Sequence, residues 1–258
     1  MSWLSGIIGG GIGAMLGGPF GAIIGAAIGS NIGGGQKVSA GAGRVGFSEA
    51  QRRQALFFTA AFSMVGKLAQ ADGRVCEDEI DALKRISRDA LRLDGQTLSY
   101  ALSVFNQAKS SPEPFEAYAR EFGSLFGQDQ QMCSFMMSFL FEVAMADGQL
   151  HPGEEQMLLS AKEAFRLHDS LYQSLRDRFV GSASPTRVGL AKHFEALGVS
   201  EEADVAAIKK AYRKKASEFH PDKIEGKGLP PEFIKFANDK LAEINASYEA
   251  LMTAHKAA

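Results

Sequence analysis

Apolar residues recur at helical spacing through the middle of the chain. One such stripe consists of Phe58, Phe62, Val65 and Leu68. No convincing strand alternation interrupts this spacing, so the pattern predicts an all-α domain over residues 48–180.

A second helical pattern occupies residues 190–258. The segment from His193 to Leu197 predicts a short helix closed by Gly198, and Asp204 is a suitable N-cap for a longer one. The next helix is expected after the Pro-Pro pair at 230–231. The apolar positions of the two longer helices are Val205, Ile208, Tyr212, Ala216 and Phe219, and then Phe233, Phe236, Leu241, Ile244, Tyr248 and Leu251. They predict a helical hairpin with the short helix across it.

The first 36 residues carry no charged side chain. This apolar segment is longer than the roughly 20 residues that a helix needs to cross a bilayer, and it predicts a membrane anchor over residues 1–36. A signal peptide, the main alternative, needs basic residues before the apolar run, and none precedes it here. A flexible glycine-rich tail is less consistent with the Ile, Leu and Ala content.

Glycine recurs at every fourth position of this segment, at Gly9, Gly13, Gly17, Gly21, Gly25, Gly29 and Gly33. Such a glycine zipper lets helix backbones approach closely in lipid. A step of four residues drifts by about 40° around a helix, so one straight partner helix cannot use all the glycines. Either two copies cross at a few of them, giving a homodimer through the anchor, or the helix breaks at Gly17-Gly18-Pro19 and forms a hairpin.

Basic residues follow the apolar segment and none precedes it. They are Lys37, Arg44, Arg52 and Arg53. This asymmetry predicts a single pass through the inner membrane with the other domains in the cytoplasm. Residues 37–47 and 181–189 have linker composition and separate the anchor, the middle domain and the C-terminal hairpin.

Composition excludes several classes of function. A formal net charge of −2 over 258 residues argues against a nucleic-acid-binding protein of the strongly basic kind. The two cysteines, Cys76 and Cys133, are interpreted as buried small hydrophobic residues. His151 and His168 have no nucleophile at a motif spacing, so we expect neither catalysis nor a cofactor.

The middle domain contains an internal repeat. LAQADGRVCEDEIDAL, from Leu68, matches VAMADGQLHPGEEQML, from Val143. Gly73 and Gly148 suit the left-handed position that ends a helix. In each repeat a glutamate lies seven positions after the aspartate.

Two interpretations of the repeated acids are open. As capping residues, Glu79 and Glu154 reach back to the start of the following helix. As metal ligands, they converge with Asp72 and Asp147 to give four oxygen donors. We favour capping and assign no metal. The doubled Ala-Asp-Gly pattern resembles the TerB tellurite-resistance family over about residues 50–178, a family for which metal binding has been suggested.

The stretch YRKKASEFHPDK, Tyr212 to Lys223, ends in a sharp corner. The residue before a proline is disfavoured in helical geometry, so the helix is expected to stop at His220. Asp222 then projects from an exposed turn beside a basic helix flank.

Three stretches resemble the J domain of the DnaJ co-chaperones: HFEALGV (193–199), IKKAYRKKASEFHPDK (208–223) and LAEINASYEAL (241–251). The resemblance implies a DnaK-type chaperone ATPase as partner, with His220, Pro221 and Asp222 acting on the junction that restrains ATP hydrolysis. The docking residues it implies are Lys209, Lys210, Tyr212, Arg213, Lys214, Lys215 and Lys223.

The whole chain resembles the membrane-anchored DnaJ-like co-chaperones. The resemblance implies a non-enzymatic protein whose J domain stimulates a DnaK-type ATPase while the TerB-like domain selects the client or pathway. The alternative is a metal-binding envelope-stress sensor or scaffold with an accessory J domain.

Overall fold

The computed structural model of the chain describes residues 18–31, 48–71, 87–88, 91–146, 148–180, 190–220 and 227–257. In these ranges the chain forms helices joined by turns and contains no strand, which confirms the all-α class. The helices are α3 (Gly18–Asn31), α4 (Glu49–Leu68), α6 (Gly95–Ser110), α7 (Phe115–Phe126), α8 (Gln130–Ala144), α9 (Pro152–Ala164), α10 (Asp169–Val180), α11 (Ala191–Leu197), α12 (Val205–Glu218) and α14 (Pro231–Ala257).

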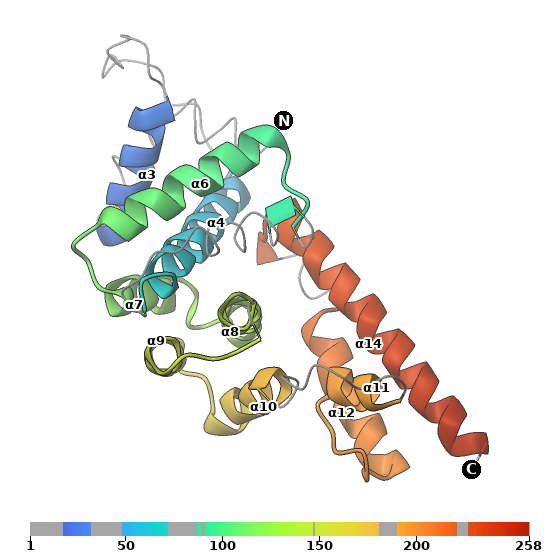
Figure 1. Cartoon of the computed structure of the whole chain (residues 1–258). Coiled ribbons are helices and arrows are strands. Elements are labelled where there is room, and N and C mark those ends of the chain that lie inside the picture. Colours follow the sequence, from blue (N-terminus) through green and yellow to red (C-terminus); the bar gives the residue numbers. More distant parts are fainter. Residues whose placement is uncertain are drawn as a thin grey trace.

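Helix α4 lies at the centre of the helical domain (Figure 1). The described helices of this domain are α4, α6, α7, α8, α9 and α10, and α3 packs on it. Helix α4 begins with a capping box in which the N–H of Gln51 donates to Ser48 Oγ over 3.2 Å and Ser48 N–H donates to Gln51 Oε1 over 3.1 Å. From Ala55 to Leu68 every residue is buried, as expected of a helix surrounded by other helices. The predicted stripe from Phe58 to Leu68 is confirmed.

Lys67, a buried basic residue of α4, has specific partners. Lys67 Nζ donates to the carbonyl of Ser111 over 2.7 Å and lies 6.0 Å from the centre of the Tyr118 ring. Burial lowers the pKa of the Lys67 ammonium, while Glu113 acts in the opposite direction. A neighbouring glycine brings two backbones together, because a Cβ on Gly66 would lie 2.6 Å from the carbonyl oxygen of Phe105 in α6.

Helix α3 is the described part of the predicted anchor, and it packs on the helical domain. Phe20, Ile24 and Ala27 are fully buried against α4, α6 and α7. The helix starts at Gly18, with φ of +85°, and the N–H of Phe20 donates to Glu121 Oε2 over 2.8 Å. Burial raises the pKa of the Glu121 carboxyl, and the bond from Phe20 acts against that shift.

The remaining predicted anchor residues, 1–17 and 32–36, lie outside the described part of the chain, and with them Gly9, Gly13, Gly17 and Gly33. Within the described residues, no helix has the length and apolar character needed to span a bilayer.

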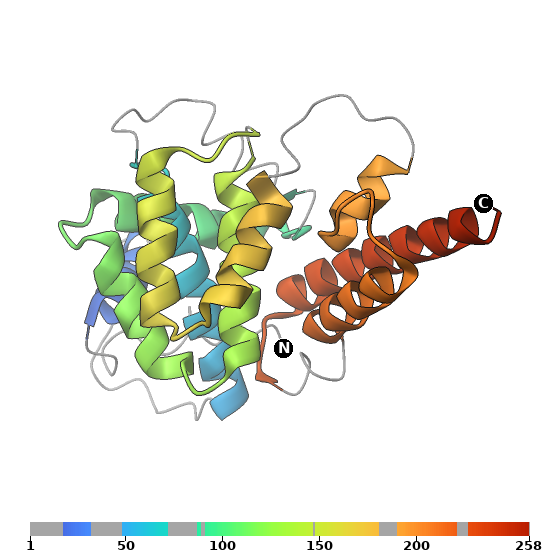
Figure 2. The ribbon, with the colours of Figure 1, turned by 90° about the horizontal axis from the view of Figure 1, so that it is seen from below.

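The C-terminal unit, made of α11, α12 and α14, is the predicted hairpin with a short helix across it (Figure 2). Gly198, with φ of +67°, ends α11, and Asp204 caps α12 by accepting the N–H of Ala207 over 2.7 Å. The sequence predicted both boundaries. The buried residues Phe194, Leu197, Ile208, Ile244 and Leu251 fill the space between these helices.

The two units share one aromatic core, which the sequence did not predict. Phe233, fully buried at the start of α14, lies 5.0 Å from Phe57 in α4 and 5.1 Å from Phe139 in α8, ring centre to ring centre. Phe236 lies 5.9 Å from Phe135. Helical spacing predicted that Phe233 and Phe236 are buried, but their aromatic partners belong to the helical domain.

Polar contacts surround this core. Gln54 Nε2 donates to the carbonyl of Leu229 over 3.2 Å, and Lys240 Nζ lies 3.1 Å from Glu142 Oε1. Gly228, with φ of +74°, passes close to α4, since a Cβ there would lie 3.2 Å from Arg53 Cβ. The approach to α14, residues 227–230, therefore packs directly against the helical domain.

Replacing Phe233 with alanine is predicted to lower the free energy of unfolding by about 3–5 kcal/mol, the usual cost of removing a fully buried ring. Chemical denaturation of the full chain, followed by circular dichroism, measures the change. The neighbouring exposed variant Lys235→Ala is the control and should stay within about 0.5 kcal/mol of the original chain. Equal stabilities for the two variants would contradict the shared core.

Candidate partner-binding site

Helix α12 carries the basic residues that the sequence singled out. Lys209, Lys210, Arg213 and Lys214 are exposed on it. Arg213 Nε donates to the carbonyl of Lys209 over 3.2 Å, which holds that guanidinium along the helix. Side chains one turn apart share a helix face, so Lys209, Lys210, Arg213 and Lys214 give α12 a basic outer surface.

Lys215 and Tyr212 lie differently from the four exposed bases of α12. Lys215 is buried, and its Nζ donates to the carbonyl of Ala196 in α11 over 2.6 Å. Tyr212 is half-buried and stacks on Tyr248 of α14, with ring centres 4.1 Å apart and an angle of 16°. Both side chains therefore contribute to the packing of the hairpin.

The helix ends where the His-Pro-Asp motif begins. Its last helical residue is Glu218, and the N–H of Phe219 closes the final turn on the carbonyl of Lys215 over 3.3 Å. His220 follows and is exposed. Pro221, Asp222 and Lys223 lie outside the described residues. The predicted helix end before the proline is confirmed.

The end of α12 lies against the helical domain. Phe219 is almost fully buried, and its ring centre is 6.1 Å from that of Phe135 in α8. Gln131 Nε2 donates to the carbonyl of Ser217 over 2.9 Å, and Lys214 Nζ lies 3.3 Å from Ser174 Oγ in α10. The basic face is thus bordered by α8 and α10 at its C-terminal end.

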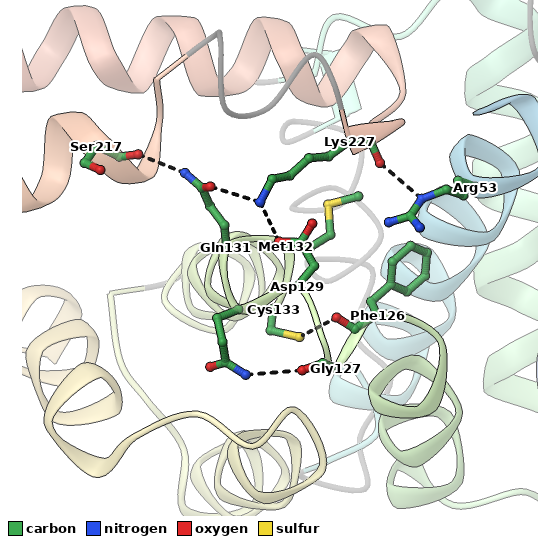
Figure 3. A network of polar contacts seen from close by, with 10 residues as sticks. Arg53, Phe126, Gly127, Asp129, Gln131, Met132, Cys133, Ser217 and Lys227 are labelled. Carbon is green, nitrogen blue, oxygen red and sulfur yellow. Dashed lines mark hydrogen bonds and ion pairs between the residues drawn. The ribbon is translucent and has the colours of Figure 1, made fainter. Parts of the chain in front are cut away.

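A polar network joins the two units beside this point (Figure 3). Lys227 Nζ donates to Asp129 Oδ1 over 2.6 Å and to Gln131 Oε1 over 3.0 Å. The carbonyl of Lys227 accepts a hydrogen bond of 3.3 Å from Arg53 Nε. Sequence analysis did not identify Gln131, Asp129 or Lys227 as functional. Their spacing forms no motif, and only the stretch KGLPPEF, residues 227–233, marks the approach to α14.

Cys133 lies in the same part of α8, and the prediction of a buried cysteine is confirmed for it. Its Sγ is fully buried and lies 3.4 Å from the carbonyl oxygen of Phe126 (Figure 3). Burial, with a smaller contribution from the charge of Asp129, raises the pKa of this thiol to about 12. Cys76 lies outside the described residues.

The surroundings of His193 in α11 shift its pKa. Burial, and then the charge of Lys192, lower the pKa of His193. Its Nδ1 lies 3.2 Å from Ser247 Oγ in α14. The neutral form of this imidazole is therefore favoured, and the ring helps to pack α11 on α14.

The second copy of the internal repeat is described almost completely. Gly148 has φ of +88°, Pro152 is the first residue of α9, and Glu154 Oε2 accepts the N–H of His151 over 3.0 Å. The predicted capping role of Glu154 is confirmed. A Cβ on Gly153 would lie 2.6 Å from the carbonyl oxygen of Ala71, so the segments around the two Ala-Asp-Gly sequences lie close together. Asp72, Glu79 and Asp147 lie outside the described residues.

Comparison with known families matches both units. The family described as "Tellurite resistance protein TerB" matches residues 58–177, and the "DnaJ domain" matches residues 192–258. Both resemblances, and their order along the chain, are confirmed. No solved structure matches the chain.

Relatives align along most of the chain. A protein of Photobacterium profundum named Co-chaperone protein DjlA is 33% identical over 238 residues, which cover 84% of this chain and 85% of the relative. The protein of the same name from Escherichia coli K12 is 31% identical over 225 residues, covering 80% and 82%. Since these relatives exceed 30% identity over at least 80% of both chains, this protein belongs to the DjlA family of co-chaperones.

Proposed function

We propose that this protein stimulates ATP hydrolysis by a DnaK-type chaperone through its C-terminal J domain. The observation that carries the proposal is the exposed basic face of α12, which ends at the exposed His220 of a His-Pro-Asp sequence. The DnaJ match over residues 192–258 and the co-chaperone names of the relatives support it.

The mechanism is a coupling between two proteins, and no bond is made or broken by this chain. The basic residues Lys209, Lys210 and Arg213 attract an acidic surface and set the orientation of the encounter. His220, Pro221 and Asp222 then act on the partner in the state that hydrolyses ATP. A coupling free energy of about 1–3 kcal/mol changes the partner's equilibrium about 5- to 150-fold.

The helical domain is proposed to select the client or pathway. It packs directly on the J domain through Phe233 and Phe236. A client held on the helical domain is therefore carried at a fixed distance from the partner chaperone. The TerB match supports a discrete module in this region.

We also propose that the N-terminal segment attaches the protein to the inner membrane in a single pass, with the other domains in the cytoplasm. The uncharged run of residues 1–36 and the bases that follow it support this proposal. A pass that uses the whole run requires α3 to leave its position against α4, α6 and α7 and enter the bilayer. The small residues Ala22, Gly25 and Ala26 of α3 are exposed. Homodimers would form where the glycine zipper of one copy crosses that of another.

The variant His220→Gln is predicted to abolish stimulation of the partner and to leave the fold intact, because His220 is exposed and lies beyond the last residue of α12. Single-turnover ATP hydrolysis by a DnaK-type chaperone measures the effect. His255→Gln, the same change at an exposed histidine of α14, is the matched control and should retain full stimulation. Stimulation by the His220 variant equal to that of the control would refute the proposal.

Stimulation is predicted to weaken with salt, because exposed charges are screened beyond about 10 Å at 0.1 M ionic strength. The double variant Lys209→Gln/Lys210→Gln should need more protein for half-maximal stimulation and should show a shallower salt dependence. Lys235→Gln removes one exposed base of α14 and should behave as the original chain does. Identical salt dependence in all three proteins would exclude α12 as the docking surface.

Replacing Gly25 with leucine is predicted to lower the yield of crosslinked dimer in membranes. Gly25 is exposed, and a Cβ there would meet nothing within 4 Å in this chain, so the substitution leaves the fold undisturbed. Ala26→Leu adds a similar side chain to the next position, outside the glycine zipper, and is the control. Equal dimer yields for the two variants would rule out association through the zipper.

A further inference from the structure

Gln131 of the helical domain contacts both sides of the sequence that carries the His-Pro-Asp signature. Its Nε2 donates to the carbonyl of Ser217, three residues before His220, over 2.9 Å. Its Oε1 accepts a hydrogen bond of 3.0 Å from Nζ of Lys227, on the far side of the signature. One amide therefore joins the end of α12 to the approach to α14 (Figure 3).

The bond to Ser217 engages a carbonyl close to the C-terminal end of α12. The last carbonyls of a helix have no N–H donor one turn ahead, so they need a side chain, water or a capping residue. Ser217 lies in the last turn of α12. The Gln131 amide supplies a donor at that position and fixes the direction in which the helix ends.

Gln131 is itself held on a rigid support. It lies in the first turn of α8, whose N-cap Asp129 accepts the N–H of Met132 over 3.1 Å. Met132 and Cys133, the next two residues, are buried. The cap and the buried neighbours hold the backbone of Gln131 in place, so its amide reaches both partners from a fixed point.

Two further contacts act at the same place. Lys227 Nζ bonds to Asp129 Oδ1 over 2.6 Å, a charge-assisted contact that fixes the far side of the signature to α8. Phe219 packs against Phe135 of the same helix, while the next residue, His220, is exposed. Helix α8 thus holds the residues on both sides of His220 and leaves the histidine itself accessible.

We propose that Gln131 is a positioning residue for the J domain: through the carbonyl of Ser217 it orients the end of α12, so that His220 meets the partner chaperone in one geometry. This inference rests on the proposed stimulation of a DnaK-type ATPase. It assigns to the TerB-like domain a direct part in that stimulation, separate from client choice.

The test uses the full chain and two variants at position 131. Gln131→Met has a similar length and makes neither hydrogen bond. Gln131→Glu still accepts from Lys227 but has no hydrogen to donate to Ser217. Gln130→Met is the matched control, because it makes the same change one residue earlier in α8. Among the described residues, the Gln130 amide donates to the carbonyls of Gly127 and Phe165, both in the helical domain.

Two quantities are measured on each protein. The first is the concentration that gives half-maximal stimulation of a DnaK-type ATPase, together with the maximal stimulated rate. The second is the exchange rate of the Phe219 amide hydrogen, whose bond to Lys215 closes α12. A general loss of stability would accelerate amide hydrogen exchange throughout the helical domain. Loss of the Gln131 contacts alone would accelerate amide hydrogen exchange at the end of α12.

Both Gln131 variants are expected to raise the half-maximal concentration roughly three- to tenfold, as loss of about one net hydrogen bond implies. The maximal rate should be unchanged, the Phe219 amide should exchange faster by a similar factor, and the Gln130 control should match the original chain. Unchanged curves, unchanged exchange at Phe219 or increased stimulation would each overturn the inference. If the original chain gives no stimulation, the co-chaperone function fails, and the exchange rate still tests whether Gln131 holds α12.

Discussion

The burial of Phe233 in a core of aromatic rings from the other unit determines how this protein is assembled. The ring contacts Phe57 and Phe139 edge-on. Burying such a side chain contributes about 1.5–3 kcal/mol, and aromatic pairs add roughly 0.5–1.5 kcal/mol each. Units within a chain usually move relative to one another unless a hydrophobic interface joins them. Here that interface is present, so the TerB-like and J domains form one body.

Hydrophobic burial is non-directional, so the aromatic core alone does not fix the orientation of α14. The polar contacts around Phe233 fix that orientation. Arg53 Nε and Gln54 Nε2 donate hydrogen bonds to the carbonyls of Lys227 and Leu229. Lys240 forms an ion pair with Glu142. Because each contact needs a particular donor and acceptor, only one orientation of α14 satisfies all of them. The same orientation brings the end of α12 against α8. The geometry around His220 is therefore a consequence of packing that begins more than ten residues away.

Much of the fold follows from local sequence, because its causes are local. The Asp204 cap and the glycine at 148 each act within one turn of the chain, and the Phe58 stripe repeats from one turn to the next. All three were predicted correctly. The contacts between units were not predicted, since helical spacing identifies a buried face and not the surface that covers it. Phe233 was thus assigned to the hairpin alone. The lysine run gives a similar case: composition treats Lys214 and Lys215 alike, yet only the second points to the carbonyl of Ala196.

In the shared core, each unit buries apolar side chains of the other unit. A truncated chain that starts at residue 190 would leave Phe219, Phe233 and Phe236 without their aromatic neighbours, and one that stops at residue 180 would uncover Phe57, Phe135 and Phe139. Contiguous apolar surface of this kind favours aggregation. A truncation allele would therefore remove one domain and also make the remaining part of the protein insoluble. Part of its phenotype would come from that insolubility, so the role of the removed segment would be overestimated.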